Sequence, residues 1–440
     1  MSSVSPVPAR KVGLLSASAL GVGGMMGAGL YTLLGLAATT TGPWLPMAFL
    51  IAGFAAVFSV YSYAKMGATF PSSGGPANFI LKQFGNSIVS GGVNVFQYIS
   101  YLIATALYAA GFSEYVGALF SSSLPDGASR LIGPAVIVVF AAINVLGSQL
   151  VGKAETYIVA VELVILVGFM VFGFFRADFS NITVASSAGV SFIGILTASG
   201  LLYVTYQGFG VVANASGAMA RPKKELPRAM FIGLAIVAAI YLTVSTLVVL
   251  LLPQAQILAD SGHVLADAGQ AVLGRLGFVL VSGAAILATA SAVNATIFAA
   301  SNIGGFLAQH QQLPHAFQRK LAGKIPVSLI ISAVVIIVLV AFFPLSAVGQ
   351  MTSLAFLFVY AIVSLGHLKL RAQTGARAWP LVTAIVINAV MFVALLIDAI
   401  RTGPAASWIV LIVALLGSFA YAWIRSRRVP RDPAAPGRGP

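Results

Sequence analysis

Long apolar runs recur throughout this 440-residue chain and constrain its fold more than any other feature. Hydrophobic residues make up 59% of the sequence and charged residues 8%, whereas about a quarter of a soluble domain is charged. Because about 20 apolar residues span a bilayer core, we expect an all-α polytopic membrane protein with twelve transmembrane helices. The expected spans are Val12–Ala38, Trp44–Ala64, Ile88–Leu119, Leu131–Leu150, Ala154–Phe175, Phe192–Met219, Ala229–Leu252, Leu276–Ala300, Pro326–Phe343, Val348–Leu368, Trp379–Ile400 and Ser407–Ile424.

Basic residues gather on one side of these spans. The formal net charge is +14, and of the 24 lysines and arginines only Arg130, Arg176, Arg275 and Arg401 fall in the opposite set of loops. This positive-inside pattern predicts a multi-pass protein of the cytoplasmic membrane, with residues 1–11 and the tail 429–440 in the cytoplasm. The Pro-, Gly- and Arg-rich tail is expected to be disordered. The basic excess then indicates orientation and contact with anionic lipid, not nucleic-acid binding.

The sequence carries no recognisable catalytic or metal-binding pattern. Cysteine is absent, which excludes disulfides, thiolate metal sites and cysteine nucleophiles. The four histidines, His263, His310, His315 and His367, lie in loops or at a helix end without metal-ligand spacing. No nucleophile-elbow or Walker motif is present. We therefore expect no enzymatic activity, no bound metal and no cofactor.

Glycines interrupt the first expected span. The segment GVGGMMGAGLY at residues 21–31 contains five glycines, each weakening a helix by about 1 kcal/mol relative to alanine. In lipid, the freed amides and carbonyls need partners, and the carboxylate and ammonium of a substrate could supply them. The alternative is close helix packing through Gly23 and Gly27. The candidate substrate residues here are Met25, Met26, Gly27, Ala28 and Gly29.

The sixth expected span repeats this interruption. YVTYQGFG at residues 203–210 places glycines and polar side chains at membrane depth, in a run long for one straight crossing. Matched interruptions five spans apart favour broken helices and a 5+5 inverted repeat. Its halves are expected at residues 12–175 and 192–370, with two extra helices at 377–426. The second group of candidate substrate residues is Val204, Thr205, Tyr206, Gln207, Gly208 and Phe209.

Glu162 is the one ionisable residue deep in an expected span. A carboxyl there costs about 2.5–3.5 kcal/mol or more unless it is paired, hydrated or protonated, so Glu162 is a candidate proton carrier. The alternative is a protonated, structural glutamate. Thr289 and Ser291 could supply oxygen ligands to a coupling cation, or bond to helix carbonyls. Tyr98 and Tyr101 could close over a substrate, or simply pack.

Four segments resemble the amino acid–polyamine–organocation (APC) superfamily of transporters: GMMGAGLY at 24–31, YQGFG at 206–210, Asn214–Ala229 and Asn294–Pro314. The resemblance is closest to the prokaryotic proton-coupled amino acid permeases. It implies the five-plus-five inverted repeat of the sodium-coupled leucine transporters, with helices 1 and 6 broken and two helices added at the C-terminal end.

The resemblance also implies roles at the breaks. The amides of Ala28 and Gly29 would bind the substrate carboxylate, and the carbonyl of Met25 would bind its ammonium. Backbone groups facing the ammonium would come from Val204, Thr205 and Gln207.

Two departures from the family pattern bear on coupling and selectivity. Glu162 stands where the proton-coupled relatives carry a lysine, which leaves a proton or another cation as the coupling ion. Gly210 and Gly217 replace acids common near the sixth-helix break, which favours small or neutral substrates. We therefore expect a permease that imports amino acids, with a proton as the coupling ion. The alternatives are an amino acid or amine exchanger and a polyamine permease, and more distantly a receptor or channel.

Overall fold

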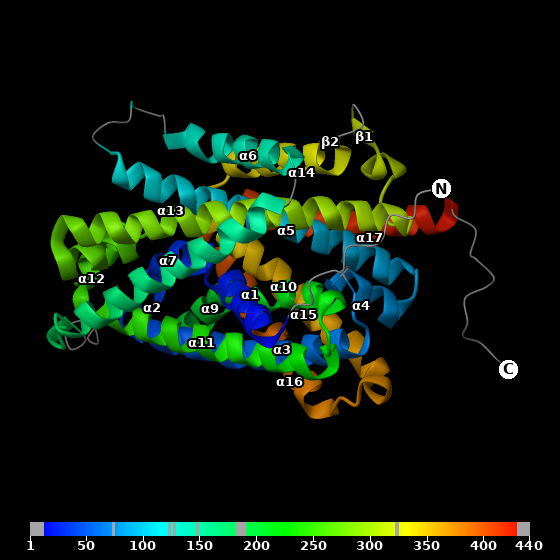
Figure 1. Cartoon of the computed structure of the whole chain (residues 1–440), viewed down its shortest axis with the longest axis horizontal. Helices are drawn as coiled ribbons and strands as arrows, with labels where there is room; N and C mark the ends of the chain where they lie inside the picture. Colours follow the sequence, from blue (N-terminus) through cyan, green and yellow to red (C-terminus); the bar gives the residue numbers. More distant parts are fainter. Residues whose placement is uncertain are drawn as a thin grey trace, which may run out of the picture.

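The computed structural model describes residues 13–72, 75–121, 125, 129–146, 149–181, 191–321 and 325–428. Residues 1–11 and the tail 429–440, both expected in the cytoplasm, lie outside these ranges, as do the side chains of Ala28 and Lys153. Within the described ranges the fold is helical apart from one two-residue antiparallel ribbon, in which Lys320 pairs with Pro326 and Leu321 with Ile325. The long helices run roughly along the longest axis of the molecule (Figure 1).

The α-helices are α1 (Leu14–Met26), α2 (Ala28–Thr41), α3 (Leu45–Thr69), α4 (Gly75–Phe84), α5 (Ile88–Leu119), α6 (Ser129–Leu146), α7 (Gln149–Phe174), α9 (Phe192–Leu202), α10 (Phe209–Asn214), α11 (Pro222–Leu251), α12 (Gln254–Ala259), α13 (Val264–Gln309), α14 (Val327–Phe342), α15 (Leu345–Thr374), α16 (Ala378–Thr402) and α17 (Ala405–Arg428). Short 3-10 helices are η1 (Gly42–Trp44), η2 (Tyr203–Tyr206), η3 (Ala215–Ala218) and η4 (His315–Gln318). The ribbon strands are β1 (Lys320–Leu321) and β2 (Ile325–Pro326).

Local sequence explains where several helices begin and end. A capping box starts α5, in which Ser87 and Ser90 exchange side-chain and backbone hydrogen bonds. Pro222 is the first residue of α11, a position where its missing amide costs nothing. Gly375 ends α15 with φ of +61°, a conformation that glycine adopts without a steric penalty.

The helix content and hydropathy confirm a polytopic, all-α membrane protein. Nine helical segments within the described ranges are long and apolar enough to cross a membrane, judged by length and composition. Three shorter apolar helices lie at Leu14–Met26, Arg130–Val145 and Val327–Phe342. The count of twelve spans and the inverted repeat stay predictions.

Two helices extend beyond their expected spans. Residues 222–228, between two expected spans, form the first turns of α11, and the preceding N-cap residue Arg221 donates from its Nε to Glu225 Oε1 at 3.1 Å. The expected span Leu276–Ala300 belongs to the longer helix α13, whose conformation departs from helical at Leu273 and Gly274. Gly274 has a φ of +61°, so the kink falls just before the residue where the sequence predicted the span to begin.

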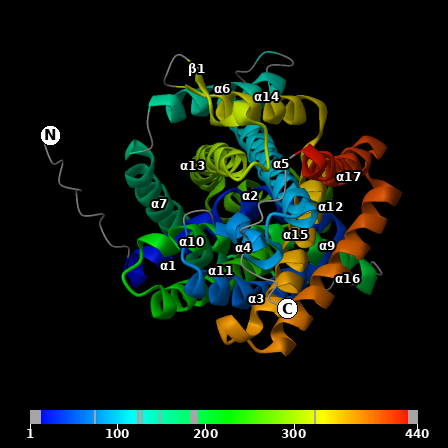
Figure 2. The ribbon, with the colours of Figure 1, turned by 90° about the vertical axis from the view of Figure 1, so that its right-hand side faces the viewer.

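Tyrosine and phenylalanine rings pack together in the interior of the bundle. Viewed along the bundle, α6 and α14 lie together on one side and α16 and α17 on another, while α2, α10 and α15 lie nearer the middle (Figure 2). There the ring of Tyr63 packs against Phe209 and Tyr360, with centroids 5.1 and 5.2 Å away. Tyr203 packs against Tyr360 at 5.8 Å. These contacts fix η2 and α10 against α3 and α15, and so hold the second interruption in place.

Candidate substrate-binding site

Both predicted interruptions are present as breaks in helical structure. The helix α1 ends at Met26, Gly27 has non-helical angles of φ −38° and ψ −135°, and α2 begins at Ala28. In the second break α9 ends at Leu202, the chain continues as η2, and α10 begins at Phe209. The structure therefore supports broken helices over uninterrupted helices with packing glycines at both positions.

Glycines at the two breaks allow their backbones to touch. A Cβ atom at Gly29 would lie 2.9 Å from Thr205 Cα and 3.2 Å from Thr205 Cβ. A Cβ atom at Gly208 would overlap the backbone of Gly24 and Met25. Because no side chain fits at either contact, the two breaks meet backbone to backbone.

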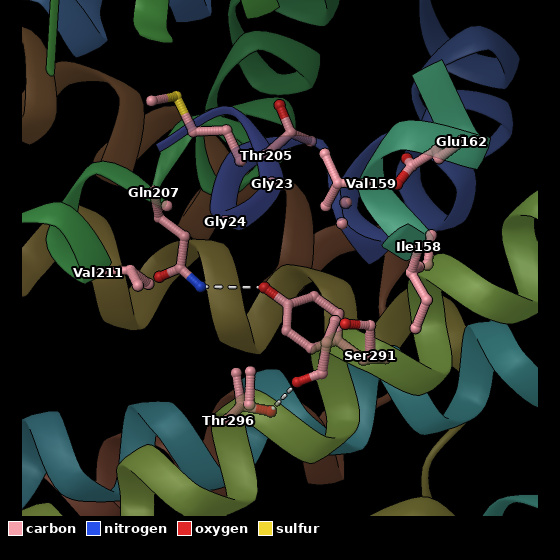
Figure 3. Close-up of a pocket in the computed structure, with 18 of the residues that line it drawn as sticks. Gly23, Gly24, Ile158, Val159, Glu162, Thr205, Gln207, Val211, Ser291 and Thr296 are labelled. Carbon is pink, nitrogen blue, oxygen red and sulfur yellow. Dashed lines mark hydrogen bonds between the residues drawn. The ribbon is translucent and has the colours of Figure 1, made fainter. Parts of the chain in front are cut away.

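A 70 Å³ cavity lies where the breaks meet α5, α7 and α13. Figure 3 shows the side chains of Glu162, Gln207 and Ser291 around this space. Its lining residues are Gly23, Gly24, Met25, Gly27, Gly29, Tyr101, Tyr108, Ile158, Val159, Glu162, Val204, Thr205, Gln207, Gly208, Val211, Ala288, Ser291, Ala292, Ala295 and Thr296.

Ten of the expected site residues line this cavity. From the breaks they are Met25, Gly27, Gly29, Val204, Thr205, Gln207 and Gly208, and from the surrounding helices Tyr101, Glu162 and Ser291. Ala28 is the first residue of α2.

The structure does not bring the other five to the cavity. Tyr98 bonds to Ser332 Oγ at 2.8 Å, and the Tyr206 hydroxyl donates to the carbonyl of Phe49 at 3.0 Å. Phe209 packs into the aromatic interior described above, and Thr289 donates to the carbonyl of Ala285 at 2.6 Å. Met26 is fully buried in the core without lining the cavity. Inside a helix bundle an aromatic ring can pack against other rings, and a hydroxyl can donate to a backbone carbonyl. Such a residue near a break therefore need not contact a ligand.

Glu162 is the one carboxyl among the cavity-lining residues. Its side chain is 1% exposed, and its Oε1 has no hydrogen-bond partner among the described residues. The buried phenol of Tyr31 is its neighbour on the α2 side. A buried polar atom without a partner costs about 1–3 kcal/mol, so this oxygen is available to a proton, a substrate group or a water.

Two tyrosines that the sequence did not single out complete the site. The Tyr241 hydroxyl, from α11, donates toward the carbonyl of Met25 at 2.6 Å and lies 3.2 Å from the carbonyl of Thr205. It therefore links the ends of both breaks. Within the cavity lining, Gln207 Nε2 donates to the Tyr108 hydroxyl at 3.0 Å (Figure 3). Neither tyrosine carries a local sequence signal, because each is one aromatic residue in an apolar run.

Comparison of the sequence with known proteins identifies the family of this chain. The family described as amino acid permease matches residues 12–419. The inner membrane transport protein YbaT of Escherichia coli is 28% identical over 95% of this chain and 97% of its own. Cationic amino acid transporter 4 of Mus musculus is 27% identical over 84% of this chain and 61% of its own.

The serine/threonine exchanger SteT of Bacillus subtilis is 26% identical over 70% of each chain. These similarities agree with the resemblance found in the sequence, and the relatives are transporters, not enzymes. The chain is thus a multi-pass membrane protein that belongs to the amino acid permease family, within the APC superfamily of transporters.

Proposed function

We propose that this protein is a secondary active transporter that imports small neutral amino acids across the cytoplasmic membrane by proton symport. The observation that carries the proposal is one cavity shared by both helix breaks, the carboxyl of Glu162 and the hydroxyl-bearing residues Ser291 and Thr296 of α13. The proposed topology has twelve spans, ten of them in a five-plus-five inverted repeat, and both termini in the cytoplasm.

The first turn of α2 is the proposed carboxylate site. No side chain caps this helix at Gly27, and the first amides of any α-helix lack intrahelical partners. The amides of Ala28 and Gly29 are therefore suited to a carboxylate, which the positive end of the helix dipole also attracts. The missing side chain at Gly29 lets η2 approach this turn, so both breaks can contact one small ligand.

The substrate ammonium is proposed to bind between the carbonyls of Met25 and Thr205. The Tyr241 hydroxyl already donates toward these two carbonyls. Each carbonyl oxygen has two lone pairs, however, and can accept a second hydrogen bond. The 70 Å³ volume and the Gln207–Tyr108 bridge across one wall favour a small side chain on the substrate.

The cavity extends toward one end of the bundle. It is lined by Gly23 and Gly24, which precede the first break, and by Val211, which follows the second. These half-helices lead toward the start of α1 and the basic start of α11, which the positive-inside pattern assigns to the cytoplasm. We accordingly interpret this conformation as open inward, one of the two states that alternating access requires.

Glu162 is the proposed proton carrier. It lines the same cavity as the proposed ammonium site, so its ionised form would attract the substrate ammonium or a coupling cation. Ser291 on α13 also lines the cavity and could assist a cation. Thr289, the other expected hydroxyl ligand, lies outside the cavity lining, so Ser291 is the better placed of the two.

A cationic substrate is the second candidate, because the only carboxyl in the cavity lining would pair with a cationic side chain. The name of the mouse relative specifies cationic amino acids. Exchange is the corresponding rival to symport, and the name of SteT specifies a serine/threonine exchanger.

Uptake into proteoliposomes tests these alternatives together. Labelled alanine, serine, leucine, arginine and putrescine would be supplied with and without an inward proton gradient, with sodium or potassium outside, and with or without amino acid inside. Proton symport predicts gradient-driven accumulation of the small neutral amino acids into empty vesicles. Uptake only into preloaded vesicles would establish exchange, and accumulation that requires sodium would overturn the proton assignment.

Glu162→Gln tests the coupling role. The substitution retains the size and much of the hydrogen bonding but removes the titrating carboxyl, so we expect binding to persist while gradient-driven accumulation is lost. Glu114→Gln is the matched control, because Glu114 lies on α5 outside the cavity lining. Accumulation retained in full by Glu162→Gln would assign this residue a structural role.

A further inference from the structure

An apolar groove of 310 Å³ lies on the outer surface between α3 and α11, away from the substrate cavity. Leu50 and Phe54 line it from α3 and are 49% and 58% exposed, so the groove faces outward. Ala235 and Ala238 line it from α11. Tyr206 is the one polar residue in the lining, and its hydroxyl already donates to the carbonyl of Phe49. The groove therefore offers apolar surface and no unsatisfied hydroxyl.

A second, basic pocket of 470 Å³ continues from this groove, since Val57 and Phe231 line both. Lys65 and Arg377 supply its charge, and neither forms a salt bridge among the residues that the structure describes. Lys65 Nζ donates to the carbonyl of Gly375 at 3.4 Å, which holds the ammonium at the pocket. An anionic group would find two cations here and no competing carboxylate in the lining.

We propose that these two connected pockets bind one anionic glycerophospholipid, with the phosphate between Lys65 and Arg377 and an acyl chain in the groove above Tyr206. The dimensions agree with this occupant. From Leu50 to Lys65 the helix α3 rises about 22 Å, at 1.5 Å per residue. One leaflet measures roughly 20–22 Å from the bilayer midplane to the outer edge of the headgroups.

The surroundings also favour a lipid. Trp379 lines the basic pocket and its ring packs against Phe58 at 6.0 Å, and tryptophan is enriched where a membrane meets water. Basic pockets between membrane helices on the cytoplasmic side commonly hold anionic headgroups. The apolar groove would thus hold the acyl chain, and the basic pocket would hold the headgroup of the same lipid.

This site would act on the substrate cavity through Tyr206. Tyr206 is the last residue of η2, between Thr205 and Gln207, and both of these neighbours line the substrate cavity. An acyl chain in the groove would pack on the α3 and α11 side chains that cover the fully buried Tyr206, and would so support η2 from outside while a substrate contacts it from inside. Bound lipid should therefore stabilise the second break.

Thermal unfolding of the purified full-length protein in detergent tests the headgroup. Phosphatidylglycerol should raise the unfolding midpoint by roughly 3 °C at hundredfold excess over its dissociation constant, and phosphatidylcholine with the same acyl chains should raise it less. The double variant Lys65→Gln/Arg377→Gln should lose this difference. Arg371→Gln, which removes a charge from α15 outside the basic pocket, should retain it. Equal responses to both lipids in the unmodified protein would overturn the proposal.

The acyl chain has a separate test. Ala235→Phe should fill the groove and abolish the phosphatidylglycerol response, whereas Ala239→Phe, on the same helix and exposed but outside the groove, should leave it unchanged. Glycerol phosphate without acyl chains should produce no shift. An equal shift from glycerol phosphate, or an unchanged lipid response in monodisperse Ala235→Phe protein, would overturn the assignment of the groove. Both tests report lipid binding through the unfolding midpoint and not through uptake, so their results do not depend on the proposed transport activity.

Discussion

Gly29→Ala is the sharpest test of the proposed carboxylate site. The added Cβ would lie 2.9 Å from Thr205 Cα, whereas ordinary contacts begin at about 3.4 Å. The first turn of α2 and η2 must then separate by about 0.5 Å. Thr205 Cα belongs to the backbone and cannot rotate away as a flexible side chain would, so the displacement falls on the proposed amide donors themselves.

The size of the effect follows from hydrogen-bond geometry. A charge-assisted N–H···O⁻ bond is about 2.7–2.9 Å long, and an added 0.5 Å takes it beyond the usual range. Losing one hydrogen bond to a charged group costs about 1.5–3 kcal/mol. The dissociation constant for a bound amino acid should therefore rise roughly 10- to 150-fold, and Gly29→Val should bind still more weakly.

Equilibrium binding of a labelled amino acid to purified, monodisperse protein measures this change. Gly283→Ala is the matched control, because a Cβ there would meet nothing within 4 Å and the position lies in α13. The control should bind as the unmodified protein does. If folded Gly29→Ala bound within threefold of the unmodified protein, the reasoning from close backbone approach would be refuted.

Two further substitutions test the walls of the cavity. Gln207→Leu removes the bridge to Tyr108 and should shift competition toward amino acids with larger apolar side chains, while Tyr206→Phe, which lies outside the cavity, should leave the competition profile unchanged. Tyr241→Phe removes the donor shared by two carbonyls, so both ligand affinity and the unfolding midpoint should fall, as binding and thermal-shift measurements would report. Unchanged midpoint and affinity in Tyr241→Phe would show that the hydroxyl does not hold the breaks together.

The breaks could be predicted because composition controls them. Glycine disfavours helix, and membrane depth makes an unpaired backbone costly, so the clusters around Gly27 and Gly208 had to differ from plain helices. The depth of Glu162 was likewise predictable from the length of its apolar run. These features depend on residue type and position along the chain, both of which a single sequence contains.

Side-chain direction at the second break could not be predicted in the same way. The segment η2 is a 3-10 helix with three residues per turn, so the face of each side chain shifts relative to an α-helix. Gln207 turns into the cavity while Tyr206 turns out toward the groove. Tyr241 lies far along the chain from Met25, and only the packing of α11 beside α1 brings its hydroxyl to that carbonyl.

The direct backbone contact of Gly24 with Gly208 affects how inactive variants should be interpreted. Neither residue has a side chain that could recognise a ligand, yet any larger residue at 208 would force the two broken segments apart. A mutational scan read only by uptake would rank such positions beside true recognition residues. Measuring the residual uptake of several substrates would separate the two classes of residue. A spacing defect lowers the uptake of every substrate alike, whereas loss of a recognising side chain changes the order of substrate preference.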